Sequence, residues 1–596
     1  MKPITDCNGI PYPVYTTGTV TLCKTVEGAR PEGSVFSLKI ETTGDNARLP
    51  LPGQFFMLRS VKSQQLLARP ISVFHADNTS RGVEVTFLIL LKGKGTTELC
   101  SLEVDDKVQI LGPLGNVFPR PALTSDNEKV LIVGGGIGVA PVAGFAESLP
   151  ENSYDFIASF KSGSYGLENI RAKNLTITTD DGSVGIKGMV TAAIDANRIK
   201  AEGYKAVYAC GPAPMLNYIK TVSEEAGVQC WISMEARMAC GVGVCLGCVI
   251  PTTEGNLRCC KDGPVFDSKI LSFPKPEPCR IKSAGTITEP DLSVTVAGVK
   301  FQNPLIGSSG TFGFGTEYAS VFDVNRLGGI ASKGLTLEKK AGNNGIRIWE
   351  TPSGLMNSIG LQNPGIPHFI EKELPEMLAL KPVAIANLSG SSLETYVEGA
   401  KLLDKTEVPV IELNISCPNV SAGGAAFGMS CSSASTVVSA VRKVTKKPLW
   451  VKLTPQSPEL NKVAVSCIES GADAISLCNS FQGVAIDVET GRPVFEKIKA
   501  GFGGPAVRPI AVRLIYELYE TIKSLPEEKQ VPIVAIGGIA TWQDVIEFVM
   551  AGADLVEVGT NTFANPLTML ECIEGIEAYM KRKGIASLSQ IKGVAH

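Results

Sequence analysis

The sequence contains few histidines and no excess of charge of either sign. Only three histidines occur among 596 residues, and the formal net charge is −3 with 19% charged residues. A chain this close to neutrality argues against nucleic acid as its main partner. The uncharged stretch 130–146 is short for a membrane span and is interrupted by glycines and by Pro141, so we expect a strand, a turn and the start of a helix there rather than a membrane contact. Solenoid repeats and low-complexity segments are also missing.

Cysteine, in contrast, is abundant, with sixteen residues in the chain. The first residues, 1–7, contain no apolar stretch typical of a signal peptide. We therefore expect reduced thiols in the cytoplasm rather than disulfides. A chain of 596 residues is also too long for one core, which predicts about three to five domains.

Three cysteines near the middle of the chain follow a metal-cluster spacing. Cys240, Cys245 and Cys248 are spaced C-x4-C-x2-C, and the adjacent Cys259 and Cys260 offer a fourth thiolate. This is the spacing of a plant-type [2Fe–2S] cluster. Structural zinc is a weaker alternative because it favours paired CxxC motifs or histidines, and plain buried cysteines are weaker still. A [2Fe–2S] cluster moves single electrons, so the pattern predicts a redox enzyme.

The pattern of strands and turns divides the chain into five parts. Residues 10–120 alternate short β-rich runs with turn residues, typical of a small antiparallel barrel. Strand, glycine and helix units over 125–228 indicate a parallel α/β domain. The cysteine segment 229–272 and a Pro-rich linker at 273–290 follow.

The last part, 291–596, repeats strand and helix units. Its eight candidate strands predict a (β/α)8 TIM barrel, whose active site lies at the C-terminal strand ends. These strands are 304–307, 329–332, 383–386, 409–413, 449–453, 474–477, 532–536 and 554–558.

Polar residues or glycines end nearly every one of these strands. One such residue would be a turn residue, but the whole set favours an active site. The set is Lys333, Asn387, Asn414, Lys452, Asn479, Gly537, Gly538, Gly559 and Thr560. The glycines end the last two strands, where TIM barrels commonly bind phosphate. The two lysines would suit an anionic substrate or a reduced flavin.

Cys417 follows the fourth strand between Asn414 and Asn419. Alone, a cysteine in this place could be a base, a nucleophile or a packing residue. Because the chain has so few histidines, a cysteine is the natural proton acceptor at the barrel mouth.

Five segments of the barrel half are long, ordered and individually specific. They are SGTFGFG at 309–315, SKGLTLE at 332–338, NSIGLQNPG at 357–365, NISCPNV at 414–420 and IGGI at 536–539. Together they resemble the catalytic subunit of the NAD-linked (type 1B) dihydroorotate dehydrogenase family. The resemblance implies bound FMN and oxidation of (S)-dihydroorotate to orotate in pyrimidine (UMP) biosynthesis. It also implies that Cys417 removes the C5 proton while the C6 hydride passes to flavin N5.

The same resemblance implies two sets of binding residues in the barrel. The substrate set is Lys333, Asn357, Ser358, Ile359, Gly360, Leu361, Asn414, Asn419, Asn479 and Ser480. The FMN set is Ser309, Lys333, Gly334, Asn387, Asn414, Lys452, Cys478, Gly504, Gly537, Gly538, Gly559 and Thr560. Lys333 belongs to both sets and would lie against flavin and substrate, as a second catalytic residue beside Cys417.

Three motifs of the first half resemble ferredoxin-reductase-like proteins. Residues 69–72, followed by 93–96, resemble an FAD signature; the motif at 134–141 with a later Cys210-Gly-Pro resembles a nicotinamide domain, although its glycines do not complete G-x-G-x-x-G. The implied FAD residues are Arg69, Pro70, Ile71, Ser72, Leu88, Ile89, Leu90, Gly95 and Thr96. The implied NAD residues are Gly134, Gly135, Gly136, Gly138, Cys210, Gly211 and Pro212. NADP remains an alternative because Lys161 lies near where a 2′-phosphate could bind.

Residues 10–272 as a whole resemble the electron-transfer subunit that accompanies the type 1B catalytic subunit. By that resemblance Cys260 rather than Cys259 is the fourth cluster ligand, beside Cys240, Cys245 and Cys248. Electrons would pass from FMN to the cluster, to FAD and then to NAD⁺, and a homodimer would form through the barrel. The partners would be small molecules, with no nucleic acid and no membrane. The sequence does not fix the physiological direction.

Two other functions remain open. One is a dihydropyrimidine dehydrogenase-like, NAD(P)H-dependent pyrimidine reductase, although the extra [4Fe–4S] cysteine runs of that family are missing. The other is an electron-transfer or scaffold protein with an inactive barrel, against which the intact Cys417 and Lys333 argue.

Overall fold

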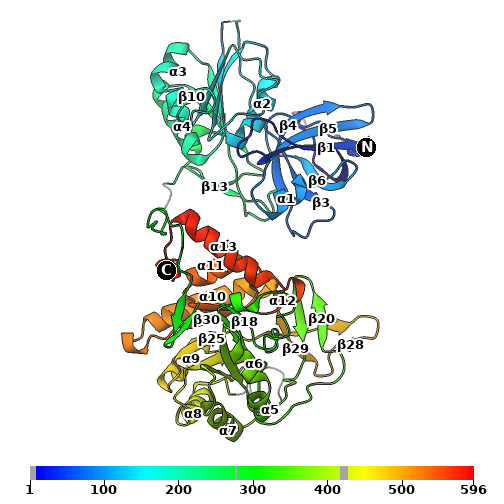
Figure 1. Ribbon diagram of the computed structural model, residues 1–596. Helices are drawn as coiled ribbons and strands as arrows, with labels where there is room; N and C mark the ends of the chain where they lie inside the picture. The colour runs from blue at the N-terminus through cyan, green and yellow to red at the C-terminus, as the bar shows by residue number, and fades with distance from the viewer. Residues whose placement is uncertain (1–8, 126, 275–277, 417–426) are drawn as a thin grey trace. The chain divides into compact units, whose positions relative to one another are not determined.

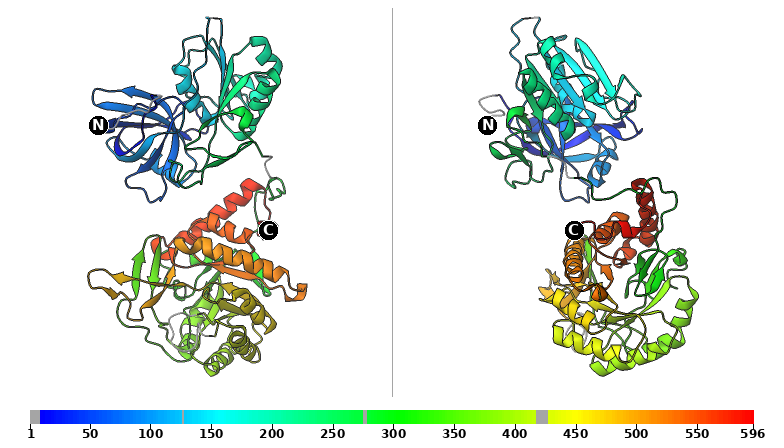
Figure 2. Two further views of the ribbon diagram at one scale, coloured as in Figure 1. Left: turned by 180° about the vertical axis from the view of Figure 1, so that it is seen from behind. Right: turned by 90° about the vertical axis from the view of Figure 1, so that its left-hand side faces the viewer.

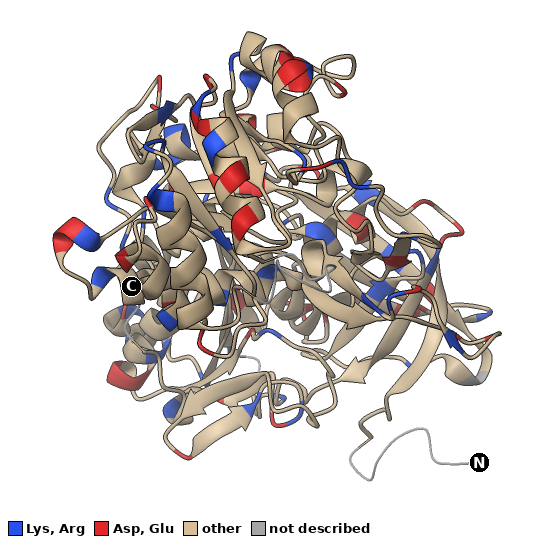
Figure 3. Cartoon of the chain, turned by 90° about the horizontal axis from the view of Figure 1, so that it is seen from below, with Lys and Arg blue, Asp and Glu red and all other residues tan. Residues whose placement is uncertain are grey.

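The computed structural model describes residues 9–125, 127–274, 278–416 and 427–596. The chain divides into two compact units, residues 1–276 and 277–596 (Figures 1 and 2). The division falls inside the predicted Pro-rich linker. Within the described residues, none of the helices is long and apolar enough to span a bilayer. Lys and Arg positions are interspersed with Asp and Glu positions along the chain (Figure 3).

The first unit begins with a closed antiparallel barrel of six strands, as predicted. Its order is β1 (Val14–Thr25), β2 (Val35–Thr43), β5 (Gly82–Leu90), β4 (Arg69–Asn78), β3 (Phe55–Ser60) and β6 (Lys107–Leu114). Alternate apolar residues such as Leu38, Phe56 and Phe87 point inward and form the core. The short helix α1 (Lys94–Cys100) follows β5.

A seven-stranded, mainly parallel sheet follows, flanked by helices, as the α/β pattern predicted. Its central strand β7 is buried along its whole length, which explains its continuous apolar sequence. The order is β10 (Ile186–Lys187), β9 (Asn174–Thr179), β8 (Tyr154–Phe160), β7 (Val130–Gly135), β11 (Ala206–Cys210), β12 (Gln229–Ser233) and β15 (Val265–Asp267). Its helices are α2 (Val139–Glu147), α3 (Ala196–Glu202) and α4 (Ala213–Ala226).

The cysteine segment is attached to this sheet at both ends. It leaves strand β12 and returns through β15, which pairs antiparallel with β12. Between them, β13 (Val249–Thr252) and β14 (Gly255–Arg258) form a two-stranded hairpin. The segment is thus anchored to the sheet on both sides of the cysteine motif.

The second unit is a closed parallel barrel of eight strands. All eight predicted strands are present, each within one or two residues of its expected bounds. They are β18 (Leu305–Gly307), β19 (Gly329–Ala331), β22 (Val383–Leu388), β23 (Val410–Asn414), β24 (Leu449–Leu453), β25 (Ala474–Leu477), β30 (Ile533–Ile536) and β31 (Leu555–Val558). The helices around them are α5 (Ile366–Glu371), α6 (Glu373–Ala379), α7 (Leu393–Asp404), α8 (Cys431–Arg442), α9 (Leu460–Glu469), α10 (Arg508–Lys523), α11 (Trp542–Met550), α12 (Asn561–Ala564) and α13 (Thr568–Lys583).

Apolar side chains fill the N-terminal end of this barrel, where the strands begin. Val410, Trp450 and Leu555 pack there with residues of the neighbouring strands and with Phe301. Phe301 belongs to the hairpin of β16 (Val294–Val296) and β17 (Val299–Phe301), which closes this end. Because strand side chains alternate, the residues two positions further along each strand also point inward, toward the open end.

A small accessory sheet lies in the loops at the open end of the barrel. It consists of β20 (Ile348–Thr351), β21 (Gly354–Asn357), β29 (Lys499–Gly503) and β26 (Phe481–Val484). A second short hairpin joins β27 (Ile486–Asp487) to β28 (Arg492–Pro493). The sheet joins loops that follow β19 and β25, so it brings distant parts of the sequence together.

The predicted linker is partly built into the second unit. The Ala284 amide donates to the Gly584 carbonyl at 2.6 Å, and the Asp291 amide donates to the Ala586 carbonyl at 2.8 Å. The Arg280 guanidinium donates to the Ala595 carbonyl at 2.9 Å. Residues 280–291 therefore run along the C-terminal segment that follows α13.

Candidate active site and redox centres

A buried lysine lies between two buried glutamates in the middle of the eight-stranded barrel. Lys452 on β24 is 3% exposed, and its Nζ lies 2.7 Å from Glu557 Oε2 on β31 and 3.3 Å from Glu412 Oε2 on β23. Lys452 also donates to Ser309 Oγ at 3.2 Å. Although burial lowers the pKa of Lys452, the two carboxylates raise it further, so the ammonium stays charged. Ser309 and Lys452, both predicted FMN residues, are thus in contact.

A chain of hydrogen-bonded side chains links the C-terminal ends of strands β22, β23 and β25. Asn387 donates to Glu412 Oε2. Asn414 Nδ2 donates to Asn387 Oδ1 at 3.1 Å, and Ser416 Oγ donates to Asn414 Oδ1 at 2.8 Å. Asn479 Nδ2 donates to Ser416 Oγ at 3.0 Å. The structure therefore brings together Asn387, Asn414 and Asn479, which the sequence placed in the site one by one.

The accessory sheet carries the other predicted substrate residues to the same end of the barrel. Asn357 on β21 donates to the Gly501 carbonyl of β29 at 3.3 Å. A side chain added at Gly501 would lie 2.8 Å from Ser480 Cβ, so Ser480 lies against the same glycine. The Ser480 amide in turn donates to Asn479 Oδ1 at 2.7 Å. Asn357, Asn479 and Ser480 therefore lie around one small surface.

Residues 358–361 form the loop beside this surface. Ser358 is buried and accepts a hydrogen bond from Asn343 at 3.0 Å, and the Ile359 carbonyl accepts from the Asn343 amide. Gly360 and Leu361 both have positive φ, 74° and 57°. Glycine adopts this conformation freely, whereas Leu361 is held in it by its surroundings.

Lys333 follows β19 at the same end of the barrel. Burial lowers the pKa of its ammonium, Glu317 raises it, and Arg347 lowers it, with a net decrease. The adjacent Gly334 is packed closely, since an added Cβ would lie 2.9 Å from Leu361 and 3.2 Å from Asn387 Oδ1. Lys333 and Gly334 thus border both the amide chain and the 358–361 loop.

Glycines gather where β30 and β31 end. Gly504, Gly537 and Gly538 have positive φ of 106°, 141° and 74°. A Cβ on Gly538 would lie 2.8 Å from the Gly504 carbonyl, whereas a Cβ on Gly559 would meet nothing closer than 3.7 Å. Gly559 and Thr560 directly follow β31, which is the usual phosphate position of this fold.

Three predicted site residues are cysteines or lie beside one. Cys417 and Asn419 lie outside the described residues, so the predicted base stays a prediction. Cys478, a predicted FMN residue, is 3% exposed, and burial raises the pKa of its thiol to about 12. Cys478 is therefore a neutral thiol at physiological pH and no proton acceptor.

In the first unit, the predicted FAD residues lie on β4, β5 and α1. The Arg69 guanidinium donates to the Leu67 carbonyl at 2.7 Å and lies against Gly95, where an added Cβ would approach it to 2.3 Å. Thr96 Oγ1 accepts from the Gly93 amide. Pro70, Ile71 and Ser72 pair with β3, and Leu88, Ile89 and Leu90 end β5. Only a glycine leaves room for Arg69 at this position.

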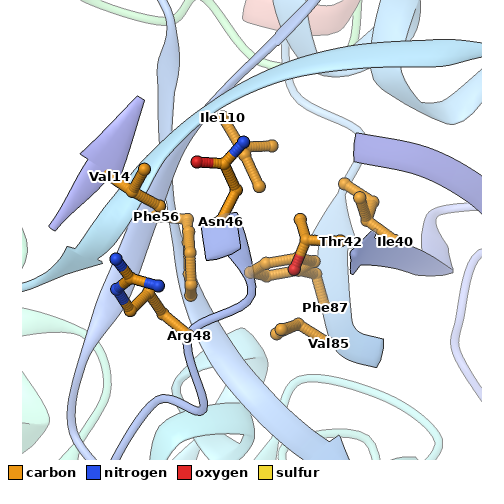
Figure 4. Close-up of a pocket in the computed structure, with 9 residues that line it drawn as sticks. All are labelled: Val14, Ile40, Thr42, Asn46, Arg48, Phe56, Val85, Phe87 and Ile110. Carbon is orange, nitrogen blue, oxygen red and sulfur yellow. The ribbon is translucent and has the colours of Figure 1, made fainter. Parts of the chain in front are cut away.

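The same barrel contains a separate small cavity, shown in Figure 4. Thr42, Asn46 and Arg48 line it beside Phe56 and Phe87. Its lining includes none of the predicted FAD residues. We therefore assign it to the interior packing of the barrel.

The two predicted nicotinamide motifs lie side by side at the ends of adjacent parallel strands. Gly134 on β7 pairs with Cys210 on β11. A Cβ on Gly138 would lie 2.6 Å from the Cys210 carbonyl, and one on Gly135 would lie 2.9 Å from Pro212. Gly136 has a φ of 54°, and a Cβ on Gly211 would lie 3.0 Å from Gly135. Lys161 follows the next strand, β8, and is exposed.

Four cysteines of the 240–260 segment form two neighbouring pairs. The Cys245 amide donates to Cys240 Sγ at 3.5 Å. Burial raises the pKa of Cys240, but hydrogen bonds from the Cys245 and Val242 backbone lower it more, to about 6. The Cys248 and Cys260 thiols lie within hydrogen-bonding reach of each other.

Cys259, which precedes Cys260 in the sequence, belongs to neither of these two pairs. It is fully buried, and its thiol donates to the Met234 carbonyl at 3.2 Å. Among the described residues, no three His, Cys, Asp or Glu side chains gather closely enough for a single metal ion. Two cysteine pairs instead suit a two-iron cluster, in which four thiolates serve two irons.

Comparisons with known proteins agree with this arrangement. Residues 291–580 match the family described as "Dihydroorotate dehydrogenase". Residues 235–272 match "Iron-sulfur cluster binding domain of dihydroorotate dehydrogenase B", and residues 26–118 match "Oxidoreductase FAD-binding domain". The dihydroorotate dehydrogenase B (NAD(+)) catalytic subunit of Petrotoga mobilis is 50% identical over 51% of this chain and 99% of its own length.

This chain belongs to the dihydroorotate dehydrogenase B family. The corresponding catalytic subunit of Brachyspira hyodysenteriae is 44% identical over 51% of this chain and 99% of its own length. A solved dihydroorotate dehydrogenase from Eimeria tenella, in complex with ferulenol, covers 53% of this chain and 91% of its own, at 19% identity and a TM-score of 0.44. The relatives thus account for the barrel half, and the two N-terminal domain matches account for much of the rest.

The residues present fit the groups expected in a dihydroorotate dehydrogenase B. Lys452, Ser309 and the amide chain offer donors for a flavin ring, and Gly559 and Thr560 follow β31, where this fold commonly binds phosphate. The two cysteine pairs supply the four thiolates of a [2Fe–2S] cluster. Arg69 over Gly95 offers a guanidinium for the FAD pyrophosphate.

Sequence reasoning missed four polar residues of this dihydroorotate dehydrogenase site: Ser308, Glu412, Ser416 and Glu557. Ser308 Oγ donates to Glu557 Oε2 at 2.9 Å, and Glu412 and Glu557 are at most 1% exposed. A signal was available in the two glutamates. Each places an ionisable side chain inside a barrel strand whose adjacent residues are apolar, which is rare unless that side chain has a partner.

Proposed function

We propose that this chain oxidises (S)-dihydroorotate to orotate in de novo pyrimidine (UMP) biosynthesis and delivers the electrons to NAD⁺. The observation that carries the proposal is the hydrogen-bonded amide chain from Asn387 to Asn479 at the C-terminal strand ends, beside Lys452. It occurs in a chain 50% identical to a dihydroorotate dehydrogenase B catalytic subunit. When bound, FMN, the [2Fe–2S] cluster and FAD supply, in that order, hydride acceptance, single-electron transfer and hydride delivery to NAD⁺.

The neutral amides orient the substrate. Asn357, Asn414 and Asn479 present donors and acceptors without net charge, which suits the imide and amide groups of a dihydropyrimidine ring. Ser480 lies beside them and can bind the same ring or its carboxylate. Because Asn414 and Asn479 are both bonded to Ser416, their side chains are fixed before substrate binds, so less entropy is lost on binding.

Cys417 acts on a reacting atom of the substrate, and Lys333 acts on the charge of the substrate. Cys417 removes the C5 proton as its thiolate, and the neighbouring Asn419 completes the substrate site. Lys333 supplies a positive charge beside the substrate carboxylate. Its pKa is decreased chiefly by burial, and that burial also strengthens its attraction for an anion.

The first unit transfers the electrons from the barrel to NAD⁺. Arg69 and the Gly93–Thr96 turn hold the FAD pyrophosphate, with residues of β4 and β5 along the ring. The two turns at Gly134–Gly138 and Cys210–Pro212 hold the nicotinamide nucleotide, with NAD favoured over NADP. Cys240, Cys245, Cys248 and Cys260 hold the cluster, and the hydrogen bond from the Cys259 thiol to the Met234 carbonyl supports Cys260 over Cys259 as the fourth ligand.

The assembly and location belong to the same proposal. The partners are small molecules, and two copies form a homodimer through the barrel in the cytoplasm. The formal net charge of −3, from 56 Lys and Arg against 59 Asp and Glu, favours partners other than nucleic acid.

An anaerobic titration of the purified full-length protein tests this function. Dihydroorotate, uracil and NADH are added separately while flavin and cluster absorbance are recorded. We expect bleaching by dihydroorotate and by NADH, and none by uracil. Bleaching by NADH with reoxidation by uracil would favour a pyrimidine reductase, and bleaching by NADH alone would leave an electron-transfer protein.

A further inference from the structure

The barrel interior contains two acidic side chains and one basic side chain that contact one another. Glu412, Lys452 and Glu557 come from three different strands, and each side chain is at most 4% exposed. Their nearest neighbours, Ser308, Ser309 and Asn387, are uncharged. Within the described residues, two carboxyl groups therefore share a single cation.

An ionised carboxylate without a full counter-charge is costly at such depth, by several kcal/mol. The two carboxyl groups also each keep one oxygen, Oε1 of Glu412 and Oε1 of Glu557, without a hydrogen-bond partner among the described residues. Yet the two groups lie within hydrogen-bonding reach of each other. One proton between them would remove the surplus charge and provide the missing hydrogen bond at once.

We propose that Glu412 and Glu557 share one proton at neutral pH, and that Glu557 is a positioning residue that holds the Lys452 ammonium beside Ser309. The cluster then carries one ammonium, one carboxylate and one carboxylic acid, and its net charge is zero. Ser308, which donates to Glu557, fixes the orientation of that carboxyl group.

The surroundings place the proton on Glu557. Burial and the neighbouring Glu412 raise the pKa of Glu557 to about 8, while Lys452 and neighbouring donors overcome burial and lower the pKa of Glu412. Among the described residues, the other titratable group beside Lys452 is the Cys478 thiol, whose pKa burial raises to about 12. Among the described residues, the other groups around the cluster are the uncharged side chains of Ser308 and Ser309 after β18, Asn387 of β22 and Ser476 of β25.

The consequence for the flavin rests on the proposed function, whereas the shared proton does not. If Lys452 and Ser309 contact FMN, a neutral cluster leaves the ammonium free to stabilise the negative charge of the reduced ring. Loss of the proton above about pH 8 would add a negative charge there and lower the FMN midpoint potential.

Infrared spectroscopy of the full-length protein tests the proton directly. At pH 7, we expect wild type to show the carbonyl stretch of a protonated carboxylic acid, with a shift in D₂O, and Glu557→Gln to lack it. Glu412→Gln should lack it too, because Glu557 alone beside Lys452 would ionise. Glu577→Gln, which changes an exposed residue of α13, should keep the band. Persistence of the band in either barrel variant, or its absence from wild type, would overturn the shared proton.

Two further measurements test the positioning role. A raised folded-state pKa means that the folded protein keeps its proton where the unfolded chain, near 4.5, has lost it. The free energy of unfolding of wild type should therefore fall as pH rises from about 4.5 to 8, and Glu557→Gln should flatten this decrease.

The FMN midpoint potential should drop more steeply above pH 8 in wild type than in Glu557→Gln. An equal pH dependence in both proteins would refute the positioning role. A protein that binds no FMN would contradict the proposed function and yet leave the infrared result intact.

Discussion

Cys417 is the residue on which the proposed chemistry depends most directly. Replacing it with Ser should preserve folding and FMN content and lower dihydroorotate oxidation at neutral pH by about 100- to 10,000-fold, because a hydroxyl is a far weaker acid than a thiol and gives little base. Steady-state rates with a dye acceptor measure this, and Cys431→Ser, a change at the start of α8, serves as control. Near-normal turnover of the Cys417 variant would remove it from the role of base.

Cys259 and Cys260 are adjacent and differ in what their thiols face. Cys259 donates to the Met234 carbonyl, whereas Cys260 lies with Cys248. We expect Cys259→Ala to keep the electron paramagnetic resonance signal of the reduced [2Fe–2S] cluster and Cys260→Ala to lose it. The opposite result would exchange the two roles.

At the scale of residues, the sequence pointed to polar side chains that the structure brings together in the barrel, but not to the contacts between them. Lys452, Asn387, Asn414 and Asn479 were found because each ends a strand. Glu412 was missed because it lies in the interior of strand β23 rather than at its end. That Glu412 meets Lys452 at 3.3 Å depends on barrel closure and register, which a linear pattern does not contain.

The turn between β7 and α2 is the element on which the proposed nicotinamide site depends. Gly138 has an ordinary φ of −64°, so only space is at issue, and a Cβ there would lie 2.6 Å from the Cys210 carbonyl. Gly138→Ala should push the Cys210–Pro212 turn away and slow FAD reduction by NADH about 100-fold. Dihydroorotate reduction of a dye should be unchanged. Stopped-flow kinetics measure both, with Ser148→Ala at the other end of α2 as control; an unaltered NADH rate would refute the placement.

The end of α13 contacts residues 280–291, the part of the predicted linker that we call the connector. Gly584 has a φ of 66°, and an added Cβ would lie 2.2 Å from Ser283 Oγ and 2.3 Å from the Gly285 carbonyl. Gly203 ends α3 with the same φ of 66° and nothing within 4 Å. Gly203→Ala should therefore cost only the left-handed backbone penalty, about 1 kcal/mol.

Gly584→Ala should cost about 1 to 3 kcal/mol more than that, because the connector must shift. Calorimetric unfolding compares the two variants, each in its own unit. Equal losses would show that residues 283–285 do not pack against α13 in solution.

At the scale of elements, the repeat of apolar runs and glycines predicted all eight barrel strands, because each such strand is buried on both faces. The antiparallel barrel and the parallel sheet of the first unit were predicted by the same reasoning. The docking of residues 280–291 was not, since hydrogen bonds such as that of Ala284 to Gly584 span 300 positions of the sequence. A Pro-rich composition indicates a linker but not where it attaches.

At the scale of the whole molecule, the chain joins two redox units that each carry their own site. The described residues of the barrel unit include the amide chain, Lys333 and Lys452, and those of the first unit include the nicotinamide turns and the cysteine pairs. We therefore expect each half-reaction to need only its own unit. Only the transfer of electrons from one unit to the other should need the cluster.

Cys245→Ala should separate these processes, because it removes one proposed cluster ligand and none of the proposed flavin-binding residues. Dihydroorotate should still reduce a dye, since Cys417 and the amides remain, and NADH should still reduce a dye, since hydride transfer to FAD needs no iron. Dihydroorotate oxidation by NAD⁺ should vanish. Cys279→Ala, at an exposed cysteine outside the motif, should keep all three activities. If Cys245→Ala retained the coupled reaction at the wild-type rate, the cluster would be structural, and electrons would have to cross between the units by another route.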